Sequence, residues 1–146
     1  MTDQIKKARD FAALHVPGDP LVLYNIWDAG SAAAVAKEGA AAVATGSWSV
    51  AEAQGYGDGE QLPLSHLVQI VERIAQTVDV PLSIDFEGGY AAGGPELTGN
   101  VVQIVTAGAV GINFEDQIVG GTGLYGIEEQ SERLRAVRAA DADLFI

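Results

Sequence analysis

The chain has 146 residues, no cysteine and a formal net charge of −12, with 8 Lys and Arg residues against 20 Asp and Glu residues. This length suits one domain with a substantial core, so residues 1–146 are expected to form a single domain. The lack of cysteine excludes disulfides, zinc–thiolate sites and a cysteine nucleophile. The acidic excess disfavours a nucleic-acid partner, and no segment reads as a signal peptide or membrane span. We therefore expect a cytoplasmic protein without a membrane partner.

Apolar segments and turn signals alternate along the chain in the order of repeated β-strand–α-helix units. Amphipathic periodicity and breakers predict helices at 3–15, 31–39, 65–78, 95–108 and 128–140. Short apolar runs predict strands at 21–28, 41–48, 82–87 and 110–116, with the start of another at 144–146. Ser31 is expected to cap the second helix and Gly39 to follow its end. The glycine-rich segment 51–63 is predicted to be a loop.

Strands that alternate with helices predict a parallel α/β sheet. A closed (β/α)8 TIM barrel needs roughly 200–250 residues, whereas this chain supplies four βα units and the start of a fifth strand. The interpretation that we favour is the N-terminal half of a barrel within a longer protein. A small open α/β sheet is the alternative.

Acidic residues follow the third and fourth predicted strands. Asp85 and Glu87 are two residues apart, so strand alternation would point both side chains to one face, and Glu115 ends the next strand. Because the carboxyl ends of parallel strands share one edge, three carboxylates would meet there and repel unless a cation joins them. Hard oxygen ligands suit Mg²⁺ or Mn²⁺. The alternative is that these acids face solvent.

Two loops could complete such a site. Asp58 lies on the long loop after the second strand, although a solvated turn aspartate is nearly as good an interpretation. The turn at Gly46, Ser47 and Trp48 offers backbone N–H groups that could bind a carboxylate or phosphate.

The segment "GINFEDQIVGGTGLYG" contains a formal G-x-G-x-x-G at Gly121, Gly123 and Gly126. In a dinucleotide fold the first glycine follows its strand immediately, but here the strand is predicted to end near Asp116. A mobile glycine-rich flap is therefore the better interpretation, and an NAD-binding oxidoreductase is the least favoured hypothesis.

The segments "NIWDAGSA", "ATGSWSVAEAQGYGDGE", "PLSIDFEGGY" and "GAVGINFEDQ" together resemble the isocitrate lyase/phosphoenolpyruvate mutase superfamily. The resemblance implies a (β/α)8 barrel, a homo-oligomer, and Mg²⁺-dependent chemistry beside a 2-oxo acid or enolate. It also implies roles for individual residues: Asp85 as the direct Mg²⁺ contact, Glu87 and Glu115 as holders of metal-bound waters, Asp58 and Glu115 as catalytic residues, Gly46, Ser47 and Trp48 as the site of the substrate carboxylate, and Tyr24 and Asp28 as the pocket floor.

The chain departs from this pattern at two places. Many relatives carry Asp where Glu87 stands, and the lyases carry a K-[KR]-C-G-H flap where this chain has "IVGGTGLYG". Isocitrate lyase activity is therefore not expected. The function hypothesis is an Mg²⁺-dependent (or Mn²⁺-dependent) lyase or mutase. It would act on a small anionic 2-oxo acid or a phosphoenolpyruvate-like carboxylate, breaking or forming a C–C or P–C bond through an enolate. An inert half-barrel fragment is the alternative.

Overall fold

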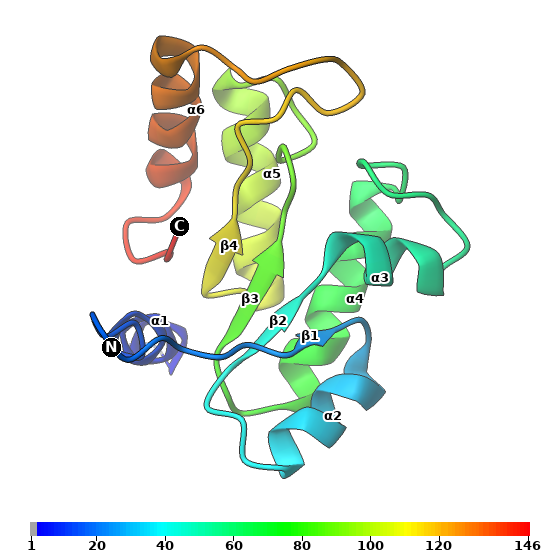
Figure 1. The fold of residues 1–146 in the computed structure, drawn as a ribbon, viewed down its shortest axis with the longest axis vertical. Coiled ribbons are helices and arrows are strands. Elements are labelled where there is room, and N and C mark those ends of the chain that lie inside the picture. Colours follow the sequence, from blue (N-terminus) through cyan, green and yellow to red (C-terminus); the bar gives the residue numbers. More distant parts are fainter. Residues whose placement is uncertain (1–2) are drawn as a thin grey trace.

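The computed structural model describes residues 3–146 and shows a parallel four-stranded sheet with helices along one side (Figure 1). The elements in chain order are α1 (Asp3–Ala13), β1 (Asn25–Ile26), α2 (Ala29–Lys37), β2 (Val43–Thr45), α3 (Ser47–Ala53), α4 (Leu64–Thr77), β3 (Leu82–Asp85), α5 (Gly94–Ala107), β4 (Gly111–Asn113) and α6 (Ile127–Ala140).

The strands are hydrogen-bonded in the order β1-β2-β3-β4, and every pairing is parallel. The chain continues this order at its end, because Phe145 forms a parallel bridge with Gly111 and its carbonyl accepts the N–H of Ile112 at 2.9 Å. A sequential parallel order with a helix after each strand is the order of a (β/α)8 barrel. The predicted start of a fifth strand is confirmed.

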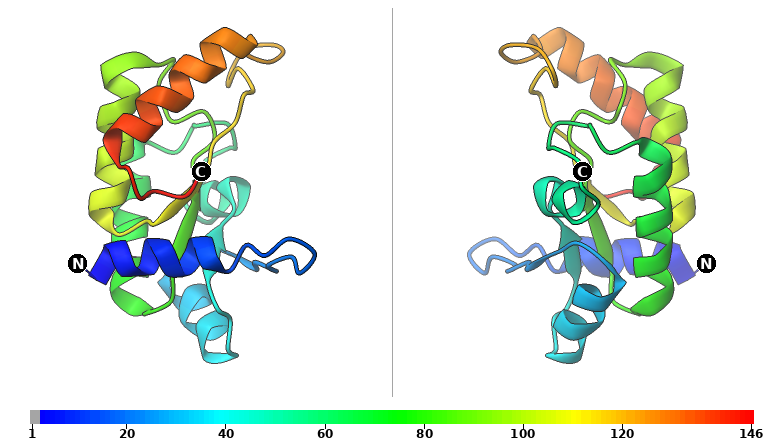
Figure 2. Two further views of the ribbon diagram at one scale, coloured as in Figure 1. Left: turned by 90° about the vertical axis from the view of Figure 1, so that its left-hand side faces the viewer. Right: turned by 90° about the vertical axis from the view of Figure 1, so that its right-hand side faces the viewer.

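The core lies between the sheet and the helices α2, α4, α5 and α6, of which α4 and α5 stand side by side (Figures 1 and 2). Close packing there depends on Gly108, which ends α5 in the left-handed conformation with φ 117°. A Cβ at this position would lie 2.5 Å from the Cβ of Ala75 on α4. Glycine thus both ends α5 and lets the two helices approach.

Helix α1 crosses the N-terminal end of the sheet (Figure 2). Its Phe11 is 1% exposed and packs with Ala42 and Val110. A Cβ added to Gly111 would lie 2.7 Å from the Phe11 ring, so only glycine allows this close approach. The N-terminal end of the sheet is therefore closed by apolar packing, and the opposite end is left for chemistry.

Several predicted boundaries were wrong. The first strand covers only Asn25–Ile26 of the predicted 21–28, and residues 47–53 form α3 where the end of a strand and a loop were expected. Seven residues are too few to show helical periodicity. The N-cap of α2 is Asp28 rather than Ser31: Asp28 Oδ1 accepts the Ser31 N–H at 2.7 Å, and the Ser31 hydroxyl accepts the Asp28 N–H at 3.1 Å. This reciprocal pair is a capping box.

The bounds of the predicted helices agree with the structure within one or two residues. Gly39 follows the end of α2 as predicted, with φ 94°. Within residues 3–146, none of the helices combines the length and apolar character that a bilayer crossing requires.

Candidate active site

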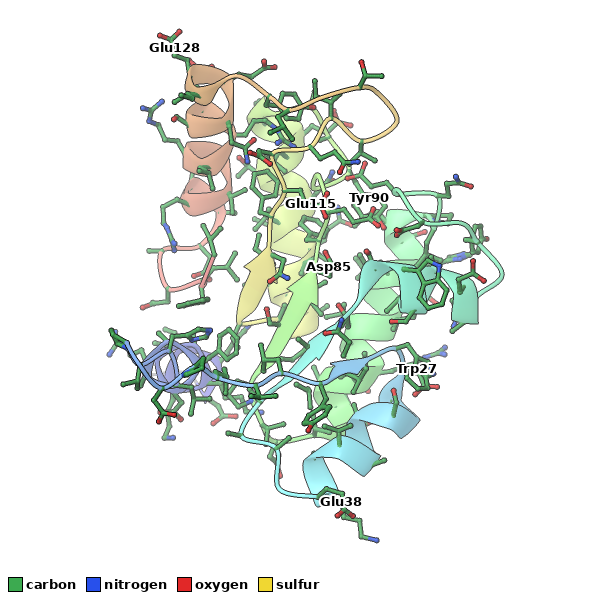
Figure 3. All side chains as sticks on the ribbon, in the orientation of Figure 1. Trp27, Glu38, Asp85, Tyr90, Glu115 and Glu128 are labelled. Atoms are coloured by element: carbon green, nitrogen blue, oxygen red, sulfur yellow. The ribbon has the colours of Figure 1, made fainter. Side chains whose placement is uncertain are left out.

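Asp85 stands at the C-terminal end of β3 and is held by β2 and α3. Its Oδ2 accepts the backbone N–H of Ser47, the first residue of α3, at 3.0 Å. Its own N–H donates to the Thr45 hydroxyl at 3.0 Å. Both bonds fix the carboxylate at the sheet edge, where Figure 3 also places Glu115 and Tyr90.

Glu87 reaches the same edge by a route that the sequence argument missed. The strand ends at Asp85, so strand alternation does not orient Glu87; instead its backbone is left-handed, with φ 49°. The side chain is buried, at 6% exposure, and its Oε2 accepts the Glu60 N–H at 2.6 Å. Asp85 and Glu87 nevertheless line one cavity of about 10 Å³, which has room for roughly one water molecule.

Glu60 is a site residue that the sequence analysis missed, although it follows Asp58 closely in "GYGDGE". Its Oε1 accepts the Tyr90 N–H at 2.8 Å, so it bonds the β3–α5 loop through both its backbone and its side chain. In the described part of the chain, the non-glycine residues with positive φ are Glu60, Glu87 and Tyr90. Left-handed backbone costs such residues about 1–2 kcal/mol each, and strain of this kind gathers at functional sites.

Burial and neighbouring negative charge raise the pKa of two acids at this edge, Glu87 and Glu115. Burial, opposed by the Glu60 N–H and aided by the charge of Asp58, raises the pKa of Glu87 from 4.5 to about 7. Burial and then the negative charges of Asp85 and Asp58 raise the pKa of Glu115. Within residues 3–146, no Lys or Arg makes an ion pair with any of them. Negative charge is therefore concentrated here with no direct ion pair to a described Lys or Arg side chain.

Glu115 is attached to the same loop, because its N–H donates to the Glu87 carbonyl at 2.8 Å beyond the end of the sheet. The ends of β3 and β4 and the loop between α3 and α4 thus bring five acids into one electrostatic group: Asp58, Glu60, Asp85, Glu87 and Glu115. Among the residues that the structure covers, no three His, Asp or Glu side chains stand close enough to bind one ion together. Metal binding by Asp85, Glu87 and Glu115 stays a prediction.

The residues predicted to bind substrate contact different elements of the structure. The Ser47 N–H is already bonded to Asp85, and Trp48, in the first turn of α3, is 62% exposed. Tyr24 is 66% exposed and lines an open groove of about 520 Å³ against α2. Asp28 caps α2, and the Ser31 N–H lowers its pKa. Within residues 3–146, Tyr24 and Asp28 contact α2, and their role in substrate binding stays a prediction.

The glycine-rich flap, residues 117–126, forms a small hairpin. Gln117 and Leu124 make an antiparallel bridge, and the Ile118 N–H donates to the Gly123 carbonyl at 3.1 Å. The motif glycines therefore do not form the tight strand-to-helix turn that a dinucleotide pyrophosphate needs. The flap interpretation fits this geometry better.

A second residue missed from sequence is Arg133 on α6, which is 2% exposed and donates to backbone carbonyls of the β3–α5 loop and of Glu115. Its position four residues before the apolar Val137 could have indicated that Arg133 is buried, since both residues lie on the same face of α6.

The sequence profile of the phosphoenolpyruvate phosphomutase family matches residues 11–146. The chain belongs to this family. It is 35% identical to an uncharacterised protein of Mycobacterium tuberculosis over 106 residues. The aligned region covers 73% of this chain and 40% of that protein.

Solved structures show the same fold. A candidate phosphonomutase from Burkholderia cenocepacia J2315 superposes with a TM-score of 0.90 at 40% identity, over 94% of this chain and 54% of that one. A phosphonopyruvate hydrolase in complex with oxalate and Mg²⁺ superposes with a TM-score of 0.86 at 23% identity, over 94% and 50% of the two chains. The chain thus spans about half the length of these barrel enzymes. Phosphomutase-family membership and a parallel α/β fold of their type are established.

Proposed function

We propose that the protein is an Mg²⁺-dependent (or Mn²⁺-dependent) lyase or mutase that acts on a small 2-oxo acid or phosphoenolpyruvate-like carboxylate. The observation that carries this proposal is the group of acids at the C-terminal edge of the sheet, which has a buried Glu87 and no ion-pairing cation within residues 3–146. Perturbed acids of this kind are typical of functional sites.

The donor chemistry fits a hydrated divalent ion. Only Oδ2 of Asp85 accepts a hydrogen bond from the described chain, so Oδ1 is available for direct contact. Glu87 and Glu115 would hold waters of the ion, as Mg²⁺ usually retains several. Bound there, Mg²⁺ would supply Lewis-acid stabilisation of the charge that develops on a 2-oxo acid when the neighbouring bond breaks.

The protein's own residues would orient and enclose the substrate. The turn at Gly46, Ser47 and Trp48, where the Ser47 N–H is bonded to Asp85, would bind the substrate carboxylate through backbone N–H groups. Asp58, which contributes to the raised pKa of Glu87, would share a proton with Glu87 while the site holds no ion. Closure of the flap at 117–126 would exclude water.

Relatives support the choice of ligand class. The phosphonopyruvate hydrolase named above is bound to oxalate and Mg²⁺, and an oxaloacetate acetylhydrolase structure contains the product oxalate. Oxalate resembles the enolate of a 2-oxo acid, so we use it as the probe. A bond change of either the C–C or the P–C type, the cytoplasmic location and the homo-oligomer remain predictions.

The test is a titration of the protein with Mn²⁺, with free Mn²⁺ measured by electron paramagnetic resonance in the presence and absence of oxalate. We expect binding that oxalate strengthens and that Asp85→Asn weakens at least tenfold, because one direct ligand is lost. Asp79→Asn, at an exposed position outside the site, is the control. Equal affinity in the wild type and Asp85→Asn would refute the proposal.

A further inference from the structure

Arg133 is a buried cation that forms no ion pair within the described residues. It is 2% exposed, yet none of the Asp or Glu carboxylates in residues 3–146 lies within ion-pair distance of it. Removing a charge from water costs several kcal/mol even after relaxation. A buried guanidinium therefore needs compensating contacts, and their position indicates what the side chain does.

The contacts of Arg133 join the two segments that follow β3 and β4. Nη2 donates to the Gly88 carbonyl at 2.6 Å and Nε to the Ala92 carbonyl at 2.9 Å, both in the β3–α5 loop. Nη1 donates to the Glu115 carbonyl at 3.1 Å and to Gln130 Oε1 at 2.6 Å. One side chain thus fixes the backbone next to Glu87 and the backbone of Glu115.

Two aromatic rings pack against the guanidinium of Arg133. Its Cζ lies 3.9 Å from the centroid of the Tyr125 ring and 4.6 Å from that of Phe114. Tyr125 lies near the C-terminal end of the flap, and its N–H donates to the Asp116 carbonyl at 2.8 Å. Arg133 therefore also contacts the base of the flap through a cation–π interaction.

We propose that Arg133 is a positioning residue that sets the separation of Glu87 and Glu115 by binding the loops that carry them. The proposal rests on the metal-dependent function proposed above. Arg133 donates no hydrogen bond to the carboxylate of Glu87 or of Glu115; it acts through the carbonyls of Gly88 and Glu115. A water-mediated metal shell tolerates little change in this separation, because supporting residues of a metal site commonly contribute tenfold to a hundredfold in affinity.

Lysine cannot replace this arginine. The planar guanidinium presents five donors in a rigid fork and stacks on rings, whereas an ammonium is a compact point charge on a flexible stem. Lysine at 133 would keep the charge but could not reach Gly88, Ala92 and Glu115 together. Arg133→Lys therefore separates the geometry of the side chain from its charge.

The experiment compares Arg133→Lys with two controls on the same helix. Arg135→Lys makes the same chemical change at an exposed position, and Val137→Ala removes buried volume on α6 without removing a side-chain hydrogen bond. Affinity for Mn²⁺ is measured by electron paramagnetic resonance, and unfolding by urea reports stability. We expect Arg133→Lys to weaken Mn²⁺ binding about tenfold to a hundredfold, and both controls to leave it unchanged.

A double-mutant cycle identifies the route of the effect. If Arg133 acts through Glu115, Arg133→Lys causes little further loss of Mn²⁺ affinity in a Glu115→Gln background, because coupled residues are not additive. Fully additive losses, or a loss in Arg133→Lys no larger than in Val137→Ala, would overturn the proposal.

Amide hydrogen exchange tests the proposal without metal. The N–H of Glu115 bonds to the Glu87 carbonyl at 2.8 Å, and the N–H of Gly89 to the Phe86 carbonyl at 2.8 Å. Arg133→Lys should lower protection at both amides and leave those of β3 protected. If the wild type does not bind Mn²⁺, the proposed function fails and this measurement alone decides: unchanged protection at Glu115 and Gly89 overturns the positioning role.

Discussion

Replacement of Glu87 by glutamine should stabilise the metal-free protein, and by an amount that depends on pH. Glutamine resembles the protonated glutamic acid: its oxygen can accept the Glu60 N–H, as Glu87 Oε2 does at 2.6 Å. Its amide could donate to the neighbouring Asp58, which contributes to the raised pKa of Glu87. The variant therefore keeps the local contacts and removes only the ability to ionise.

The magnitude follows from the two pKa values. The pKa of Glu87 is 4.5 in a freely exposed side chain and about 7 in the folded protein, mainly because of burial. Below the lower value both states are protonated, so Glu87 imposes no penalty. Between the two values the unfolded chain releases its proton while the folded chain retains it, and stability falls by about 1.4 kcal/mol for each pH unit. Above pH 7 the loss is complete, at about 3 kcal/mol.

The assay is urea unfolding in the presence of EDTA at several pH values from about 4.5 to 8, the window in which the two pKa values lie. We expect Glu87→Gln and wild type to be equal at the acidic end and to diverge by up to about 3 kcal/mol at the basic end. Glu132→Gln, at an exposed position on α6, should show no such divergence. A Glu87→Gln variant that is less stable at every pH, or whose difference from wild type does not vary with pH, would refute the reasoning.

Three further predictions use the same geometry. Binding of Mg²⁺ at about pH 6 should release close to one proton, because the ion favours ionised Glu87; calorimetry in buffers of different ionisation enthalpy measures it, and Glu87→Gln should abolish it. Gly88→Ala should cost about 1–3 kcal/mol, since its Cβ would lie 2.9 Å from Val119, whereas Gly99→Ala, with open space around it, should be neutral or stabilising in urea unfolding. Asp28→Ala should cost about 1 kcal/mol of stability through the lost cap and leave Mn²⁺–oxalate binding unchanged; lost binding at unchanged stability would instead assign Asp28 to the substrate site.

The fold was largely predictable because its signals are local. The buried positions of α4, such as Leu67, Ile70 and Ile74, recur at helical spacing, and Gly39 and Gly108 stand where helices end in the left-handed conformation. Strand limits were less predictable, since pairing with neighbouring strands decides them. The segment 21–28 is mostly apolar, yet only Asn25 and Ile26 pair with β2.

The acids of the site were predicted for a reason that was only partly correct. Asp85 lies at a strand end as expected, but Glu87 reaches the cavity through a left-handed turn that no periodicity indicates. Glu60 was missed because its role depends on two hydrogen bonds to residues about thirty positions away. Arg133 was missed because an arginine on a helix usually faces solvent, and the carbonyls that it contacts become neighbours only in the folded chain.

The two ends of the sheet contribute to folding stability with opposite sign. At the N-terminal end, Phe11 packs in apolar surroundings against Gly111, and this burial of apolar surface favours folding. At the C-terminal end the backbone of Glu60, Glu87 and Tyr90 is strained and the acids repel one another, so folding is opposed there.

A sequence selected for stability alone would not combine strained backbone and repelling acids at one edge. A divalent ion would make the electrostatic energy of this edge favourable, because it attracts the same carboxylates that otherwise repel one another. Binding to the folded state alone stabilises it by RT ln(1 + [L]/Kd), which is about 2.7 kcal/mol at a hundredfold excess over Kd. This gain is close to the penalty of about 3 kcal/mol that ionised Glu87 imposes. The metal-free protein should therefore be least stable, relative to its metal-bound form, at the pH at which the site is fully ionised.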